Sequence, residues 1–163
     1  MNARKLFLTV GFSGLSPKAP GTVGSFVSLL IGLFLLEFLH VSTLFLLALL
    51  ITVIAIKQID IYEKDVGMHD GKEIVIDELA GMWIALSICG INSENTLILA
   101  PLAFIFFRLF DIWKPSIIGK IDRDVKGGLG VMGDDIVAGF AAGIASAGIY
   151  QLLKLFILWL KIY

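Results

Sequence analysis

Cysteine, histidine and charge are all scarce in this chain of 163 residues. Its one cysteine, Cys89, can form neither an intramolecular disulfide nor a multi-cysteine metal site, which excludes disulfide redox chemistry. Of the two histidines, His40 and His69, we consider His69 a candidate acid or base because a free imidazole titrates near neutral pH. The net charge of −1 provides no basic surplus, so no nucleic-acid partner is expected.

The low charge content indicates a membrane protein. Charged residues make up 17% of the chain and hydrophobic residues 58%, against about 25% and 45–50% in a soluble domain. Apolar runs of roughly 17 to 25 residues are long enough to cross the hydrocarbon as helices. We therefore expect one domain over residues 1–163, an all-α polytopic membrane bundle of about five membrane-embedded helices. The expected helices cover residues 23–39, 41–59, 74–91, 96–113 and 136–160.

Most basic residues would then lie on one side of the membrane, here called face A. Face A comprises the segments before the first span, between the second and third, and between the fourth and fifth. The positive-inside rule predicts that face A is cytoplasmic. Eleven of the thirteen Lys and Arg residues fall there: Arg4, Lys5, Lys18, Lys57, Lys64, Lys72, Arg108, Lys114, Lys120, Arg123 and Lys126.

Three polar stretches converge on face A, and the first is SPKAPGTVGS at residues 16–25. Thr22 or Ser25 is expected to cap the apolar helix that follows. A helix N-terminus has unpaired N–H groups and partial positive charge, so Gly21 and Thr22 are candidates for binding a phosphate. A plain turn and helix cap is the alternative.

The second stretch, DGKEIVIDELAGMW at residues 70–83, places two acids about one turn inside an apolar helix. A carboxylate near the bilayer needs a partner, a cavity or an ion, because burying it costs about 2.5 to 3.5 kcal/mol at mid-membrane. Asp77 and Glu78 point about 100° apart on a helix, so we expect different roles for them. Asp77 paired with a nearby cation, and Glu78 reaching the surface, is the structural alternative.

The third stretch, residues 107–139, combines basic residues, acids and glycines. Arg108 and Asp111 share a helix face and could form a simple ion pair. A basic loop is expected after Pro115, with glycines that allow a ligand to approach the backbone closely. The candidate substrate-binding residues of this stretch are Arg108, Lys114, Lys126, Gly127 and Gly128.

Acidic residues from three different helices are expected at one depth. Repelling carboxylates that share a site favour a bound cation, and hard oxygen ligands suit Mg²⁺. Mg²⁺ in turn favours a phosphate substrate. The candidate metal ligands are Asp77, Asp111, Asp134 and Asp135, and Glu78 joins them as a candidate catalytic residue.

The motifs SPKAPGTVGS, EIVIDELAGMW, FRLFDIWKP and KGGLGVMGDDIVAG resemble those of the bacterial phosphatidylglycerophosphatase A family, in order from Ser16 to Gly139. The resemblance implies a helical enzyme of the bacterial inner membrane. It also implies Mg²⁺-dependent hydrolysis of a phospholipid substrate, phosphatidylglycerophosphate, to phosphatidylglycerol and phosphate. The family's charged motif positions correspond to Glu73, Asp77, Glu78, Asp111, Asp122, Asp134, Asp135, Arg108, Lys114 and Lys126.

Two features depart from the family pattern: Ser116 and Ile117 follow Pro115, and Gly133 precedes the paired aspartates. Neither departure removes a charged group. For the mechanism we favour attack by water, with Glu78 or a remaining aspartate as general base, over an aspartyl-phosphate intermediate.

Other functions fit the sequence less well. A CDP-alcohol phosphotransferase is the first alternative, although its DGxxAR…GxxxDxxxD pattern is missing. An ion carrier is less favoured, because carriers set ionisable residues near the bilayer midplane. The sequence does not predict an oligomeric state.

Overall fold

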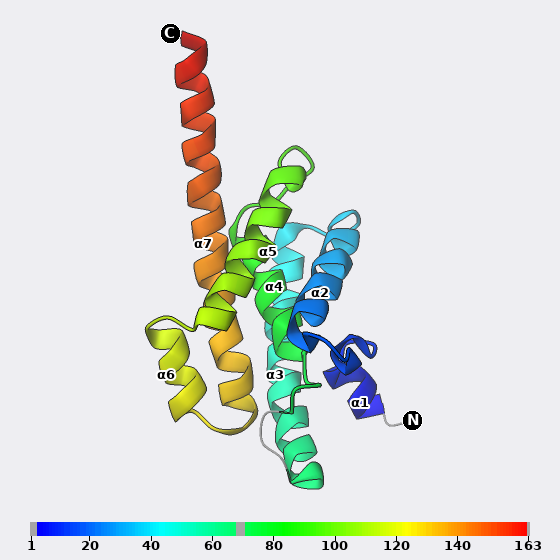
Figure 1. Ribbon diagram of the computed structural model, residues 1–163. Coiled ribbons are helices and arrows are strands. Elements are labelled where there is room, and N and C mark those ends of the chain that lie inside the picture. Colours follow the sequence, from blue (N-terminus) through cyan, green and yellow to red (C-terminus); the bar gives the residue numbers. More distant parts are fainter. Residues whose placement is uncertain (1–2, 68–70, 163) are drawn as a thin grey trace.

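The computed structural model describes residues 3–67 and 71–162, and His69 lies outside them. Every element within these ranges is helical, which confirms the expected all-α class (Figure 1). The elements are α1 (Ala3–Leu8), a 3₁₀ turn (Ser13–Leu15), α2 (Pro20–Leu36), α3 (Val41–Val66), α4 (Ile76–Ile88), α5 (Thr96–Trp113), α6 (Ile117–Asp124) and α7 (Gly127–Ile162).

Three helices, where five were expected, are long and apolar enough to cross a membrane: α3, α5 and α7. Helix α2 has 17 residues and α4 only 13. At about 1.5 Å rise per residue, α4 spans roughly 20 Å, which is less than the ~30 Å hydrocarbon thickness. Ten of the 13 residues of α4 are buried, because α2, α3, α5 and α7 all pack against it. It is the central helix of the bundle.

Helix α2 starts earlier than expected and without a side-chain cap. It begins at Pro20, whose ring pre-sets φ for a first helical position. The N-cap is Ala19, at φ 48, and neither Thr22 nor Ser25 caps the helix. The single hydroxyl hydrogen of Ser25 is instead shared between the Gly21 carbonyl oxygen and Glu78 Oε2. The predicted capping role was therefore wrong, and Ser25 faces another helix.

The structure also differs from the sequence-based expectation in the basic loop after Pro115 and in the start of the last helix. The loop contains α6, and α7 begins at Gly127, so Asp134 lies about two turns inside a helix. Asp60 on α3 caps α7, because its Oδ1 accepts the Gly128 N–H at 2.7 Å. A Cβ at Gly128 would lie 2.2 Å from the Ile56 carbonyl oxygen of α3. The glycines therefore let α7 begin directly against α3.

Helices α4 and α7 approach each other almost backbone to backbone. A Cβ on Gly139 would lie 2.3 Å from the Gly81 carbonyl oxygen, and one on Gly81 would lie 2.6 Å from the Asp135 carbonyl oxygen. One turn on, a Cβ on Gly143 would meet Ile88 at 2.6 Å. The small-residue packing face predicted on the last helix is confirmed at Gly139 and Gly143. This contact fixes Asp135 beside α4.

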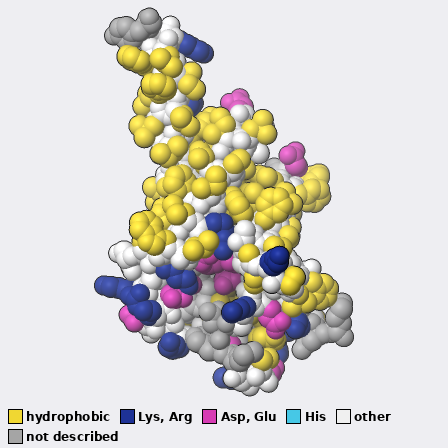
Figure 2. Space-filling view, viewed as in Figure 1, with side chains coloured by type: hydrophobic (Ala, Val, Ile, Leu, Met, Phe, Trp, Pro, Cys, Tyr) yellow, Lys and Arg dark blue, Asp and Glu magenta, His cyan; other side chains and the backbone are white. Residues whose placement is uncertain are grey.

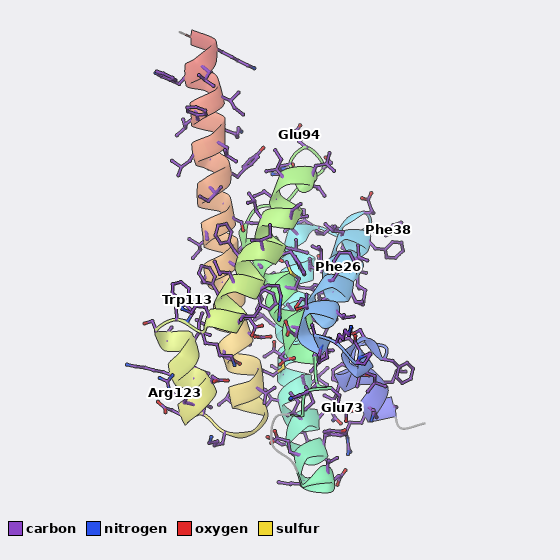
Figure 3. All side chains as sticks on the ribbon, in the orientation of Figure 1. Phe26, Phe38, Glu73, Glu94, Trp113 and Arg123 are labelled. Carbon is purple, nitrogen blue, oxygen red and sulfur yellow. The ribbon has the colours of Figure 1, made fainter. Side chains whose placement is uncertain are left out.

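Polar and apolar side chains separate along the bundle axis. Glu73 and Arg123 lie toward the end that carries α1 and α6, and Glu94 lies at the opposite end (Figure 3). Lys, Arg, Asp and Glu gather mainly at the α1 and α6 end, below a broad hydrophobic belt (Figure 2). Helix α7 extends past the bundle at the other end, where residues 151–161 are all exposed (Figure 1). The polar end is the one that the sequence assigned to face A.

The close α4–α7 contact predicts that Gly139→Ala destabilises the fold. The added methyl must displace a carbonyl, and overpacking of this kind costs about 1–3 kcal/mol. We expect the melting temperature in detergent to fall by roughly 2–4 °C for each kcal/mol lost. Gly148→Ala, on the same helix but with nothing within 4 Å of the new Cβ, is the matched control and should melt at or slightly above wild type. Equal melting of both variants would contradict the contact.

Candidate active site

An acidic cavity of about 230 Å³ opens at the face A end of the bundle. It lies among α2, α4, α5, α6 and α7, and the hollow with its acidic lining is visible in Figure 2. Two lysines, Lys72 and Lys114, also line it. The lining carboxylates are Asp77, Glu78, Asp111, Asp122, Asp134 and Asp135.

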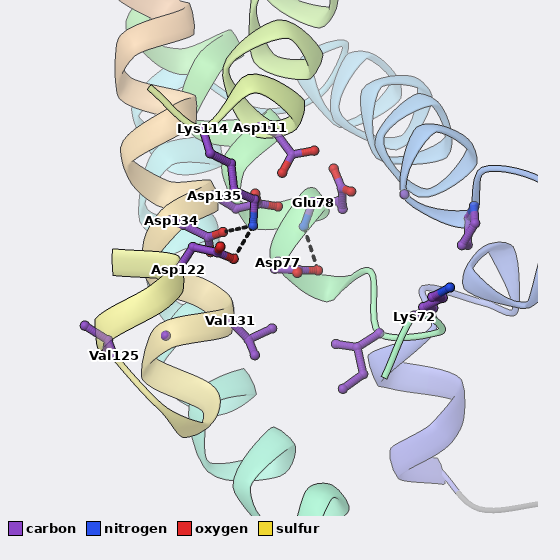
Figure 4. Close-up of a pocket in the computed structure, with 14 residues that line it drawn as sticks. Lys72, Asp77, Glu78, Asp111, Lys114, Asp122, Val125, Val131, Asp134 and Asp135 are labelled. Atoms are coloured by element: carbon purple, nitrogen blue, oxygen red, sulfur yellow. Dashed lines mark hydrogen bonds and ion pairs between the residues drawn. The ribbon is translucent and has the colours of Figure 1, made fainter. Parts of the chain in front are cut away.

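Three of these carboxylates come within 4.8 Å of one another: Glu78 from α4, Asp111 from α5 and Asp135 from α7 (Figure 4). Two unit charges at that separation repel by about 3 kcal/mol at an effective dielectric of about 20. Asp135 is only 4% exposed and has no hydrogen bond or salt bridge among the described residues. A buried carboxylate without a partner is costly to keep ionised, so this position favours a bound cation or a proton.

Arg108 supplies part of the balancing charge. Its Nη1 lies 2.6 Å from Glu78 Oε2 and 2.6 Å from Asp111 Oδ2. The Ser25 hydroxyl joins them, since it accepts from Arg108 Nη1 at 3.1 Å and donates to Glu78 Oε2 at 2.5 Å. These contacts leave Oε1 of Glu78 and Oδ1 of Asp111 available to a ligand.

Glycine at position 21 makes this arrangement possible. A Cβ on Gly21 would lie 2.4 Å from Glu78 Oε1 and 3.4 Å from Arg108 Nη2. Gly21 lines the cavity as expected of a substrate-binding residue, whereas Thr22 is exposed and outside its lining. The first turn of α2 therefore forms a wall over Glu78.

Lys114 binds two further acids. It ends α5 with a left-handed backbone, at φ 47, and its Nζ lies 2.8 Å from Asp134 Oδ2 and also pairs with Asp122. Burial alone would lower the pKa of Lys114, but the hydrogen bonds to Asp122 and Asp134 outweigh it and raise the pKa above its ordinary value. Lys114 thus stays charged and draws α6 onto α7.

Asp77 lies at the edge of the close carboxylate group. Its Oδ1 accepts the Glu78 backbone N–H at 3.0 Å, and the side chain is half-buried in the cavity wall (Figure 4). The four predicted metal ligands therefore all line one cavity, as the sequence indicated. The closest group of three, however, contains Glu78 in place of Asp77 and Asp134.

Besides Thr22, four predicted substrate-binding residues are absent from the cavity lining: Arg108, Lys126, Gly127 and Gly128. Arg108 contacts the lining acids Glu78 and Asp111. Lys126 is exposed in the turn between α6 and α7. Gly127 and Gly128 pack against α3, and the helix N-terminus that they form already binds the Asp60 carboxylate. The phosphate-binding role suggested by this glycine-rich run is replaced by helix packing.

Sequence reasoning assigned no site role to two residues that the structure brings to this region, Ser25 and Lys72. Ser25 was considered only as a helix cap. Its contact with Glu78 joins two helices 53 residues apart in sequence, and no local pattern predicts such a contact. Lys72 was counted only among the basic residues of face A. Both residues belong to polar stretches identified from the sequence, but their positions there did not predict the contact of Ser25 with Glu78 or the place of Lys72 in the cavity lining.

The fold and the site define a helical membrane protein with an acidic, partly neutralised cavity at one end. Comparison with known proteins places it more closely. The chain belongs to the phosphatidylglycerophosphatase A family, whose family model matches residues 6–150. The family resemblance of the motifs is thereby confirmed, and the protein is a phosphatase of phospholipid metabolism.

Curated relatives extend over most of the chain. Phosphatidylglycerophosphatase A of Escherichia coli (strain K12) is 42% identical over 87% of this chain and 78% of its own. The protein of the same name from Haemophilus influenzae is 36% identical over 84% of this chain and 83% of its own. A putative phosphatidylinositol-3-phosphatase of Bacteroides thetaiotaomicron is 37% identical over 82% and 86%. No solved structure matches the chain.

The three close carboxylates predict that a divalent cation stabilises the protein. Hard oxygen donors at this spacing suit such an ion, and binding at 100 times Kd adds about 2.7 kcal/mol. We expect Mg²⁺ or Mn²⁺ to raise the melting temperature by roughly 5–10 °C, at about 2–4 °C per kcal/mol. Asp111→Asn and Asp135→Asn should lose this increase.

Asp124→Asn is the matched control, because Asp124 is exposed on α6 and does not line the cavity. It should keep the full metal-induced increase. An increase that persists in both Asp111→Asn and Asp135→Asn would place the ion elsewhere.

Proposed function

We propose that this protein hydrolyses phosphatidylglycerophosphate to phosphatidylglycerol and inorganic phosphate, using Mg²⁺ held by Glu78, Asp111 and Asp135. One observation carries the proposal: carboxylates from three helices meet within 4.8 Å in a chain that is 42% identical to a phosphatidylglycerophosphatase A. The proposal revises the ligand set expected from sequence by including Glu78. Asp134 and Asp77 line the same cavity but are no longer proposed as direct ligands.

The donor set fits Mg²⁺ because each of the three residues offers a carboxylate oxygen, the ligand type that this ion prefers. When bound, Mg²⁺ would neutralise phosphoryl charge as the P–O bond breaks. Arg108 is not among the lining residues, but it contacts Glu78 and Asp111, which are. If a bound cation took over part of these contacts, the guanidinium would become available to a phosphoryl oxygen. Lys114 pairs with Asp134 on α7 and with Asp122 on α6, both in the cavity lining.

Water is the proposed nucleophile, with Asp77 as general base. Asp77 lines the cavity and uses only Oδ1 in its hydrogen bond to the Glu78 N–H, which leaves Oδ2 for a water. The proton of that water would pass to Oδ2 as its oxygen attacks phosphorus. The bond from phosphorus to the glycerol oxygen would break, and that oxygen would take a proton from solvent to give the alcohol. A covalent aspartyl-phosphate is the alternative, and the phosphoryl group of a radiolabelled substrate would then be trapped on a protein carboxylate during a single turnover.

We place the protein in the bacterial cytoplasmic membrane with the cavity facing the cytoplasm. The support is the concentration of basic side chains at the cavity end, which the positive-inside rule assigns to the cytoplasm. The lipid would lie with its headgroup in the cavity and its acyl chains against the hydrophobic belt above it (Figure 2).

Phosphatidylinositol 3-phosphate hydrolysis is a second candidate, favoured by the name of the Bacteroides relative. Both named activities hydrolyse a phosphomonoester on the polyol headgroup of a phospholipid and release phosphate. Parallel assays on the two lipids separate them by kcat/KM.

The direct test is phosphate release from phosphatidylglycerophosphate by purified protein in detergent, with Mg²⁺ and then with excess EDTA. We expect metal-dependent release, and a loss of about 10²–10³-fold in kcat for Glu78→Gln, because electrostatic stabilisation of the transferring group depends on the bound cation. Lys120→Gln, exposed on α6 and outside the cavity, is the control and should retain wild-type activity. Metal-independent release, or full activity of Glu78→Gln in a folded preparation, would refute the proposal.

A further inference from the structure

More acidic than basic side chains line the cavity. Both Lys114 in the lining and Arg108, which contacts two of the lining acids, already have carboxylate partners. Arg108 is shared by Glu78 and Asp111, and Lys114 by Asp122 and Asp134. An incoming phosphate dianion would therefore meet little uncommitted positive charge from either residue.

Lys72 is different, because it lines the same cavity and has no salt bridge or hydrogen bond from its side chain among the residues that the structure describes. It is exposed, and it lies across the cavity from Lys114 (Figure 4). Its charge is thus available to a ligand. A flexible ammonium at a cavity mouth is suited to phosphate as a point charge.

The backbone on the C-terminal side of Lys72 is fixed. Glu73 accepts a hydrogen bond from the Tyr62 hydroxyl, and Glu73 Oε2 pairs with Lys5 Nζ at 3.0 Å. Two residues on, the Val75 N–H donates to the Leu8 carbonyl at 2.9 Å. These contacts tie the segment to α1 and α3, so the Lys72 backbone is held at the cavity wall.

The Glu73 carboxylate, which fixes this segment, also stays charged at neutral pH. The hydrogen bond from Tyr62, and then that from Lys5, lower the pKa of Glu73 below its ordinary value. Glu73 is therefore ionised and compensates Lys5, leaving the neighbouring Lys72 as the uncommitted cation on this segment.

We propose that Lys72 binds the phosphomonoester group of the substrate, and the inorganic phosphate released from it, at the mouth of the cavity. This assignment rests on the proposed phosphatase function and names a substrate contact for it. Lys72 acts in binding and does not take part in bond breaking, so its loss should change KM and phosphate inhibition far more than kcat.

The test compares Lys72→Gln, Lys72→Arg and wild type by steady-state kinetics and by inhibition with inorganic phosphate. One charge-assisted contact at an exposed site predicts a rise of about 5- to 20-fold in KM and in the phosphate inhibition constant for Lys72→Gln. The value of kcat should stay within about 2-fold, and Lys72→Arg should restore most of the affinity because it retains the charge. Lys64→Gln is the matched control, since Lys64 is an exposed lysine at the same end of the bundle and outside the cavity.

Binding of inorganic phosphate to metal-loaded protein, measured by calorimetry, separates this inference from the proposed function. Weaker phosphate binding in Lys72→Gln supports the role of Lys72 even if the wild type fails to hydrolyse phosphatidylglycerophosphate, a result that would refute only the proposed substrate. Phosphate affinity and KM equal to those of Lys64→Gln would overturn the assignment of Lys72.

Discussion

The contact between the backbones of α4 and α7 is the constraint on which the rest of the structure depends. Because Gly81 and Gly139 have no side chains, the two helices meet at carbonyl distance, and this brings Glu78 on one and Asp135 on the other to the same point. The central helix, α4, is too short to span a bilayer by itself, and α2, α3, α5 and α7 surround it. As a result, packed helices hold the carboxylates of Glu78 and Asp135 close together at the polar end of the bundle.

Charge balance explains why the platform is stable and why it would take a ligand. Arg108 neutralises part of the repulsion between Glu78 and Asp111, and Lys114 does the same for Asp134 and Asp122. Asp135 remains buried with neither a hydrogen bond nor a salt bridge within the described ranges. A buried carboxylate without a partner is costly, so the divalent cation that we propose would stabilise the site and would also attract a phosphate. Affinity for the metal and affinity for the substrate would then be coupled through the same oxygens.

The sequence alone predicted the helical class, the convergence of the acids and the family, because apolar runs and charged motifs are local signals. It located α5 at residues 96–113 correctly, since both ends of that run are sharp. It misjudged the start of α7, because GGLG is a helix-breaking pattern unless a distant residue, here Asp60, caps it. It did not predict that Glu78 would lie in one close group with Asp111 and Asp135. Which acids meet depends on the rotation of α4 about its axis, and that rotation is set by tertiary packing at Gly81.

The central claim is that Glu78, Asp111 and Asp135 together hold a divalent cation. Anomalous scattering from crystals grown with Mn²⁺ in place of Mg²⁺ tests it most directly. We expect one strong peak within about 2.0–2.6 Å of oxygens from all three side chains, the usual range for hard cations, and its loss in Asp135→Asn. A peak bound only by Asp77 and Asp134, or no peak at a saturating Mn²⁺ concentration that supports activity, would contradict it.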